Sequence, residues 1–151
     1  MKQSFKTHTI QFFIMTLIGI FFNPMNMLAY SINDLYFSTT LLYGGFLMAS
    51  NMIWSHEIVH YLTIGHFNKT TFLFGIMLSL SITFILLRGQ LFVNETNWLK
   101  RMIPHHSTAL TTTTNLLKNA KINKNPKLYR LAKDIIYNQK REIDFMKLFL
   151  K

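Results

Sequence analysis

The stretch Trp98-Leu99-Lys100-Arg101-Met102-Ile103-Pro104-His105-His106 opens a run of apolar residues at helical spacing, which predicts a helix over about 96–121. Asn125-Pro126 is typical of a helix start, and predicts a second helix over about 126–150. Two helices with a short connection form an antiparallel hairpin. Pro104 either kinks the first helix or lies in the first turn of a helix that starts near Ile103.

The chain before this hairpin is strongly apolar. Three apolar segments, at about 9–29, 39–61 and 70–93, are each close to the length that crosses a bilayer as a helix. The first could be a signal peptide, but bulky residues follow where a small-residue cleavage site is expected. The sequence therefore predicts an all-α protein with three transmembrane helices in residues 1–93 and a soluble two-helix domain in residues 94–151.

Composition agrees with this division. Half of the 151 residues are hydrophobic and 15% are charged, against roughly 25% charged in soluble domains. Of the 16 Lys and Arg residues, 12 lie in residues 94–151. A basic tail suits anionic lipid headgroups or nucleic acid, although a solvated helix surface is the plainer reading. We expect the lipid bilayer, and no nucleic acid, as partner. The absence of cysteine excludes disulfides, thiolate metal sites and cysteine nucleophiles.

The hairpin brings together side chains that bind metals. Met102 stands three and four residues before the histidine pair, so the three share one side of a helix. Reflection through the hairpin connection sets them opposite a polar side of the second helix. Methionine with histidine suits copper, especially Cu(I), whereas imidazole with carboxylate suits zinc or Fe(II). A structural cluster, in which His106 bonds to Glu142, or Glu142 pairs with Arg101 or Lys100, is the open alternative. The predicted ligands are Met102, His105, His106, Gln139, Glu142 and Met146.

A second pattern lies at the end of the middle apolar segment. His56-Glu57-Ile58-Val59-His60 fits the zinc-protease pattern H-E-x-x-H, with His66 at the spacing of a third ligand. Thr63 replaces the glycine that turns the chain in such enzymes, and no sequence for a substrate cleft is evident. We therefore expect a polar helix end, with His56, His60 and His66 as secondary metal candidates and no catalytic residue.

Two segments resemble a known family. Trp98 to Leu110 and Leu131 to Lys147 are similar to domain-of-unknown-function family 305, whose pattern is a methionine-isoleucine-proline-histidine-histidine run and a second helix ending in glutamine, glutamate-isoleucine and methionine. The three preceding segments, with Arg88-Gly89-Gln90, look like its membrane-anchored branch. The resemblance implies a ferritin-like fold, and some members are associated with copper binding or tolerance outside the cytoplasm. The residues that match the family's marked positions are Met102, His105, His106, Gln139, Glu142 and Met146.

Two departures from the family pattern bear on function. Many members carry a methionine where this chain has Thr112, and its loss weakens the copper argument. The tail supplies one helical pair where a four-helix bundle needs two, which predicts a homodimer or higher oligomer. We expect a multi-pass membrane protein that is not an enzyme, with a metal-binding (copper) domain outside the cytoplasm that serves metal homeostasis or tolerance. The alternative is a structural or interaction module whose cluster only fixes helix packing.

Overall fold

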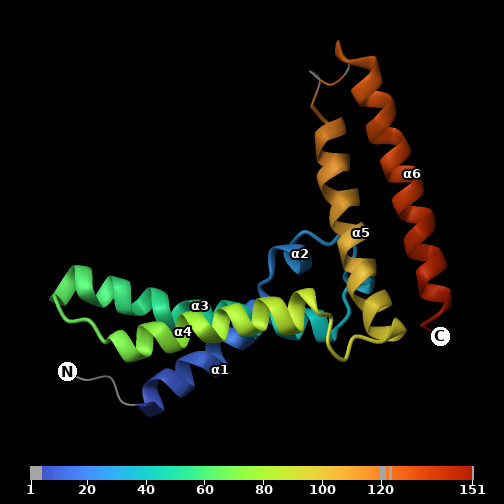
Figure 1. Ribbon diagram of the computed structural model, residues 1–151. Helices are drawn as coiled ribbons and strands as arrows, with labels where there is room; N and C mark the ends of the chain where they lie inside the picture. Colours follow the sequence, from blue (N-terminus) through green and yellow to red (C-terminus); the bar gives the residue numbers. More distant parts are fainter. Residues whose placement is uncertain (1–4, 120–121, 123, 151) are drawn as a thin grey trace. The chain divides into compact units, whose positions relative to one another are not determined.

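Every regular element of the protein is helical in the part of the chain that the computed structural model describes, which is residues 5–119, 122 and 124–150 (Figure 1). This confirms the all-α prediction. The elements in chain order are α1 (Phe5–Phe21), α2 (Pro24–Met27), the 3-10 turn η1 (Ile32–Asp34), α3 (Thr39–Ile64), α4 (Lys69–Ser81), the π-helical segment η2 (Ile82–Arg88), α5 (Glu95–Leu117) and α6 (Pro126–Leu148).

These elements group into two units with an unexpected boundary. Residues 1–22 and 39–93 form the first unit, which we call the α1–α3–α4 unit. Residues 23–38 join residues 94–151 in the second, which we call the hairpin unit. The sequence suggested a single division at residue 93. The sequence predicted that residues 23–38 are the end of a membrane span followed by a short connection. In the structure, these residues belong with α5 and α6.

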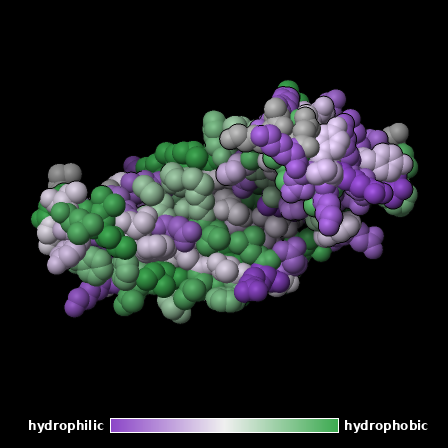
Figure 2. Space-filling view, turned by 90° about the horizontal axis from the view of Figure 1, so that it is seen from above, coloured by the Kyte–Doolittle hydropathy of each residue, from purple (hydrophilic) through white to green (hydrophobic). Residues whose placement is uncertain are grey.

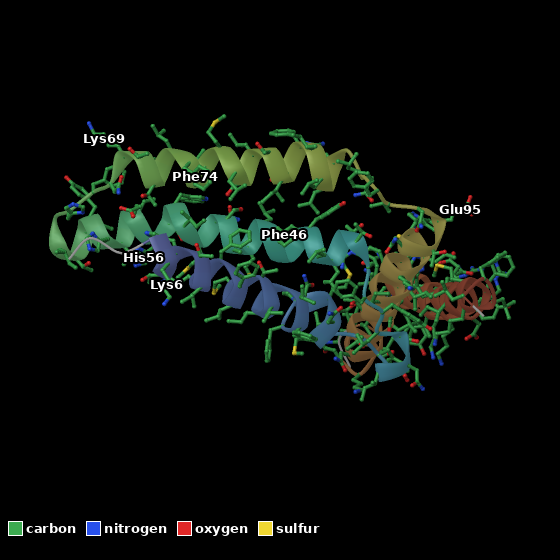
Figure 3. All side chains as sticks on the ribbon, turned by 90° about the horizontal axis from the view of Figure 1, so that it is seen from below. Lys6, Phe46, His56, Lys69, Phe74 and Glu95 are labelled. Carbon is green, nitrogen blue, oxygen red and sulfur yellow. The ribbon has the colours of Figure 1, made fainter. Side chains whose placement is uncertain are left out.

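Helix α3 runs between α1 and α4 and contacts both (Figure 3). Small residues make this close packing possible, as they do between membrane helices in general. A Cβ added at Gly45 would lie 2.8 Å from the Thr16 carbonyl oxygen of α1. On the opposite side, Ser79 of α4 donates to the Ser50 hydroxyl at 2.9 Å, and Ser50 has no exposed surface. Backbone proximity and a buried hydrogen bond thus hold the three helices together.

Two stretches are long and apolar enough to cross a membrane: Lys69–Arg88 of the α1–α3–α4 unit, and Lys6–Met27, which covers α1 and also the first residues of segment 23–38. A signal sequence near the N-terminus passes the same test, as does a core helix of a soluble protein. A core helix would be mostly buried, however, and only 17% of each window is buried here. In the space-filling view, much of the surface of this unit is coloured as hydrophobic (Figure 2).

The prediction of three transmembrane helices is wrong for the middle segment by this measure. Helix α3 has the length but not the hydropathy, since its second half carries Asn51, Ser55, His56, Glu57 and His60. Burial compensates for part of this polarity. Glu57 is 6% exposed, and its Oε2 accepts a hydrogen bond from the Asn68 backbone N–H at 3.0 Å.

The first and third predicted segments are interrupted by local signals. Helix α1 ends at Phe21 rather than continuing to residue 29, because Asn23 caps a new helix that begins at Pro24. The Asn23 Oδ1 accepts from the Met25 backbone N–H at 2.9 Å. Helix α4 widens into η2 and ends at Gly89, where a Cβ would collide with the Ile85 carbonyl oxygen.

The hairpin unit is built on α5 and α6, close to the lengths that periodicity predicted. Asn94 and Asn125 cap the two helices, accepting backbone N–H groups of Asn97 at 2.9 Å and Leu128 at 3.1 Å. Pro104 lies inside α5, and is buried there. The core consists of Ile103, Leu110, Ile143 and Met146, with Tyr36, Leu99, Met102, Ile136 and Leu150 packed against it.

Adjacent glycines of α3 give a matched test of this packing. We expect Gly45→Ala to lower the free energy of unfolding by about 1–3 kcal/mol, because the new methyl group meets the Thr16 carbonyl and the Ile20 side chain. Gly44→Ala meets nothing within 4 Å and gains helix propensity of up to about 1 kcal/mol. Denaturant unfolding of both variants in detergent micelles measures the difference. Equal effects of the two substitutions would contradict the proposed α1–α3 contact.

Candidate functional site

The predicted polar cluster forms at the α5–α6 contact, around one carboxylate. The Nδ1 of His106 lies 2.9 Å from the Oε2 of Glu142. The Gln139 side-chain amide, one turn earlier on α6, donates to the same oxygen at 3.4 Å. The His106 side chain is 16% exposed and that of Glu142 46%. Three of the six predicted site residues, His106, Gln139 and Glu142, thus lie together at this contact.

The approach of His106 to Glu142 is close but not aligned. Although the two atoms are at ion-pair distance, Nδ1 makes no hydrogen bond that meets angular criteria with any described residue, and it is buried. We regard the pair as a polar contact without a formed hydrogen bond. A buried nitrogen of this kind costs free energy unless a further group or a small rotation satisfies it.

The alternative partners of Glu142 are not used. Among the described residues, neither Arg101 nor Lys100 forms a salt bridge with Glu142, whose ionic contact is with His106. Arg101 is instead partly buried, and its Nη1 has no hydrogen-bond partner in the described part of the chain. Desolvation by this burial lowers the pKa of Arg101 from its ordinary value.

The two methionines lie in the apolar core. Met146 is 8% exposed and packs with Ile103, Leu110 and Ile143, and Met102 packs against this group. His105 is exposed, and its ring centroid lies 5.8 Å from that of His106. The cluster therefore contains His106, Gln139 and Glu142, while the thioethers contribute packing.

No group of three or more His, Cys, Asp or Glu side chains in the described residues is arranged to hold a metal ion. The donor set at this cluster is one imidazole, one carboxylate and one amide, with His105 next to it. Imidazole and carboxylate suit zinc or iron rather than Cu(I), which prefers thioethers. The observed packing gives copper no support, and metal binding at this cluster stays a prediction.

A second polar centre involves the next residue of α5, Ser107. Asp34 of η1 is 4% exposed, and the Ser107 hydroxyl donates to its Oδ2 at 2.6 Å. Lys147 of α6 lies 2.6 Å from its Oδ1. The Tyr30 backbone N–H donates to Ser107 at 2.8 Å, and the Thr108 hydroxyl donates to the Met25 carbonyl at 2.9 Å. These contacts attach residues 23–38 to both helices of the hairpin.

Sequence reasoning missed Asp34 because the segment around it reads as a polar connection. The available signal was its rarity, since Asp34 and Glu57 are the only acidic residues before residue 94. Both prove to be buried and bonded. Each of the two isolated acidic residues in this long, nearly uncharged stretch therefore fixes a local structure through a buried hydrogen bond.

A cavity of about 260 Å³ opens beside Asp34. The Lys140 Nζ lies 6.0 Å from the centroid of the Tyr30 ring at its edge, and Lys147 is paired with Asp34. Two of the four charged residues that line the cavity, Asp34 and Lys147, are paired with each other, and we assign no ligand to it. The lining residues are Tyr30, Ser31, Asn33, Asp34, Leu110, Lys140, Ile143, Asp144 and Lys147.

The secondary candidates lie in the α1–α3–α4 unit. The rings of His56 and His60 stack with centroids 6.0 Å apart, and those of His60 and His66 meet edge to face at 5.3 Å. The Nδ1 of His60 lies 3.0 Å from the His66 carbonyl oxygen. Glu57, the base of a literal protease reading, instead accepts the Asn68 backbone N–H. The three histidines are brought together, and the carboxylate between them is already engaged.

These observations define an all-helical protein with an antiparallel hairpin joined by a polar cluster. The family model "Domain of unknown function (DUF305)" matches residues 87–151. The chain is 31% identical, over 137 residues, to an uncharacterized protein of Acanthamoeba polyphaga mimivirus, covering 91% of this chain and 87% of that protein. The chain belongs to the DUF305 family. No solved structure matches it significantly.

We expect Asp34→Ala to destabilise the hairpin unit by about 1–3 kcal/mol, because Ser107 and Lys147 lose the buried acceptor they share. Asp144→Ala, an exposed acidic residue on α6, removes the same charge without a buried bond and serves as the control. Thermal unfolding followed by circular dichroism measures both. If Asp144→Ala cost as much as Asp34→Ala, the loss would come from net charge rather than from this contact.

Proposed function

We propose that this chain is a membrane-attached interaction module, in which the hairpin unit associates with a second copy and the His106–Glu142 cluster fixes the pairing of α5 with α6. The observation that carries this proposal is the placement of Met102 and Met146 in the apolar core. With the thioethers packed in the core and His106 of α5 lying 2.9 Å from Glu142 of α6, the cluster favours helix pairing over ligand capture.

The occupant we propose for α6 is a second hairpin unit. Leu131, Phe145 and Phe149 are 54%, 60% and 63% exposed, and their spacing puts them on one side, next to the core-facing side. A two-helix unit buries little apolar surface alone. Two such units would supply the four helices of a ferritin-like bundle, which is the architecture that the family resemblance implies.

The proposed attachment is to a lipid bilayer through the α1–α3–α4 unit. Large apolar side chains are exposed along both candidate spans, including Phe13 at 63% on α1 and Phe74 at 61% on α4. Exposed apolar faces of this extent are unfavourable in water and suit lipid. Asn51 and the histidines of α3 would then be polar side chains within a membrane protein. The packing of α1 and α4 against α3 would help to accommodate them.

The oligomeric state of the full chain tests the interaction. We expect a dimer in detergent micelles, and we expect Phe145→Lys to raise its dissociation constant about tenfold or more, since a buried phenylalanine contributes roughly 1.5–3 kcal/mol. Tyr137→Lys is the matched control, because Tyr137 is 66% exposed on a different side of α6. Sedimentation equilibrium measures both. A monomeric wild type, or equal loss with Tyr137→Lys, would contradict the proposal.

Metal binding at the hairpin is the second candidate function, and one observation favours it. The buried Nδ1 of His106 faces the Glu142 carboxylate without a formed hydrogen bond, and His105 adjoins them. A rotation of these side chains would offer two imidazoles and a carboxylate, a donor set for zinc and, with less support, copper. A role in metal homeostasis or tolerance would follow from such a site.

Titration with Zn²⁺ and Cu(I) tests this second function. The titration uses a His56→Ala, His60→Ala background, so that the histidines of α3 do not contribute to the measured binding. If the hairpin binds the metal, His106→Ala and Glu142→Gln should each weaken the metal affinity at least tenfold. Lys140→Ala is the control, as an exposed α6 residue outside the cluster. Isothermal titration calorimetry measures the affinities. Unchanged binding in both cluster variants, or no binding at all, would leave helix pairing as the role of the cluster.

A further inference from the structure

An apolar groove lies over α3, between α1 and α4. Its volume is about 300 Å³, which is at the lower end of the usual range for ligand pockets. Phe12 and Phe13 of α1 line one side, Phe74 and Leu78 of α4 line the other, and Ile53 of α3 lies between them. We call this feature the α1–α4 groove. A lining of this kind suits a hydrocarbon chain better than a polar ligand.

A histidine of α1 also lines the α1–α4 groove. His8 stands one turn before Phe12, and its Nδ1 is buried without a hydrogen-bond partner among the described residues. The His8 ring meets that of His56 edge to face, with centroids 6.3 Å apart, and this contact leaves the nitrogen unsatisfied. A buried polar atom of this kind costs free energy until a ligand or a water molecule bonds to it. The groove therefore combines an apolar lining with a ring nitrogen that lacks a partner.

The end of the unit where α1 and α4 begin is basic. Lys6 stands two residues before His8, Lys69 is the first residue of α4, and both are exposed. Figure 3 shows the two lysines at the same end of the unit. Glu57, the only acidic residue in 1–22 and 39–93, is 6% exposed and already accepts the Asn68 backbone N–H. Among the described residues, neither lysine has a salt-bridge partner. This end therefore complements a negatively charged group.

We infer that the α1–α4 groove holds an acyl chain of a phospholipid with an anionic headgroup, and that the headgroup lies beside Lys6 and Lys69. The apolar lining receives the chain, while the two lysines favour a headgroup of net negative charge over a zwitterionic one. The Nδ1–H of His8 would donate to an ester or phosphate oxygen, which satisfies the buried nitrogen. This inference rests on the proposed attachment to a bilayer and is independent of the pairing of hairpin units.

The test uses the full chain in detergent micelles, titrated with phosphatidylglycerol or with phosphatidylcholine, and native mass spectrometry counts the lipids bound to each chain. We expect one phosphatidylglycerol per chain, bound about tenfold more tightly than phosphatidylcholine, because each lysine near the headgroups favours the anionic lipid. Lys6→Gln with Lys69→Gln should remove this preference. Lys127→Gln with Lys133→Gln removes two exposed charges from α6 and is the control that should retain it.

Filling the groove tests the acyl chain separately from the headgroup. Leu78→Trp should weaken the binding of both lipids about tenfold, because the larger side chain would occupy the groove. Met77→Trp is the matched control, since Met77 is the neighbouring residue of α4, is 63% exposed and lies outside the lining. His8→Phe keeps a ring but removes the nitrogen, and should weaken phosphatidylglycerol binding about threefold. Circular dichroism verifies helix content, and Leu78→Phe replaces Leu78→Trp if the latter does not fold.

Three results would overturn the inference: equal affinity of the wild type for the two lipids, equal loss of preference in the α6 control, or unchanged binding in the Leu78 variant. Alkaline carbonate extraction of membranes that contain the chain tests the underlying attachment separately. If the chain stays with the membranes but shows no lipid preference, the lipid inference fails and the attachment stands. Release of the chain by carbonate would contradict the attachment itself, and the lipid inference with it.

Discussion

The hairpin unit depends on one buried carboxylate. Asp34 receives the Ser107 hydroxyl from α5 and the Lys147 ammonium from α6, and it is 4% exposed. A two-helix hairpin alone has little core, but residues 23–38 add a third covering element that Asp34 fixes to both helices. Because a buried charge is stable only when it is paired, the position of this segment is set as strictly as that of the helices.

The stretch after Pro104 serves both polar centres. His106 faces Glu142 on α6, the following Ser107 faces Asp34, and Thr108 donates to the Met25 carbonyl. Three successive residues on a helix point about 100° apart, so one short segment can contact three different partners. The histidine pair therefore lies within a stretch of α5 that contacts both α6 and residues 23–38.

Local signals in the sequence predicted most of the helices. The periodicity after Trp98 and the Asn125-Pro126 pair indicated α5 and α6 to within a few residues, and the reflected hairpin indicated His106, Gln139 and Glu142. The role of Asp34 could not be predicted, because it depends on a contact with Ser107 across 73 residues of chain. The placement of Met102 and Met146 was ambiguous, since a thioether serves equally as ligand and as core filler.

Histidine, like methionine, can serve as a metal ligand or as a structural side chain, so the two histidine clusters are compared by the contacts that they make. The pair in the hairpin matches a family pattern but has Glu142, Gln139 and an apolar core around it, all of which explain its position without a metal. The row His8, His56, His60 and His66 matches no intact pattern, since Thr63 breaks the protease spacing. Both clusters leave buried ring nitrogens without a hydrogen-bond partner among the described residues: Nδ1 of His106 in the pair, and Nδ1 of His8 and of His56 in the row. Because no three or more His, Cys, Asp or Glu side chains of the described residues are arranged to hold a metal ion, neither cluster is a formed metal site, and the unsatisfied ring nitrogens are the feature that the two clusters share.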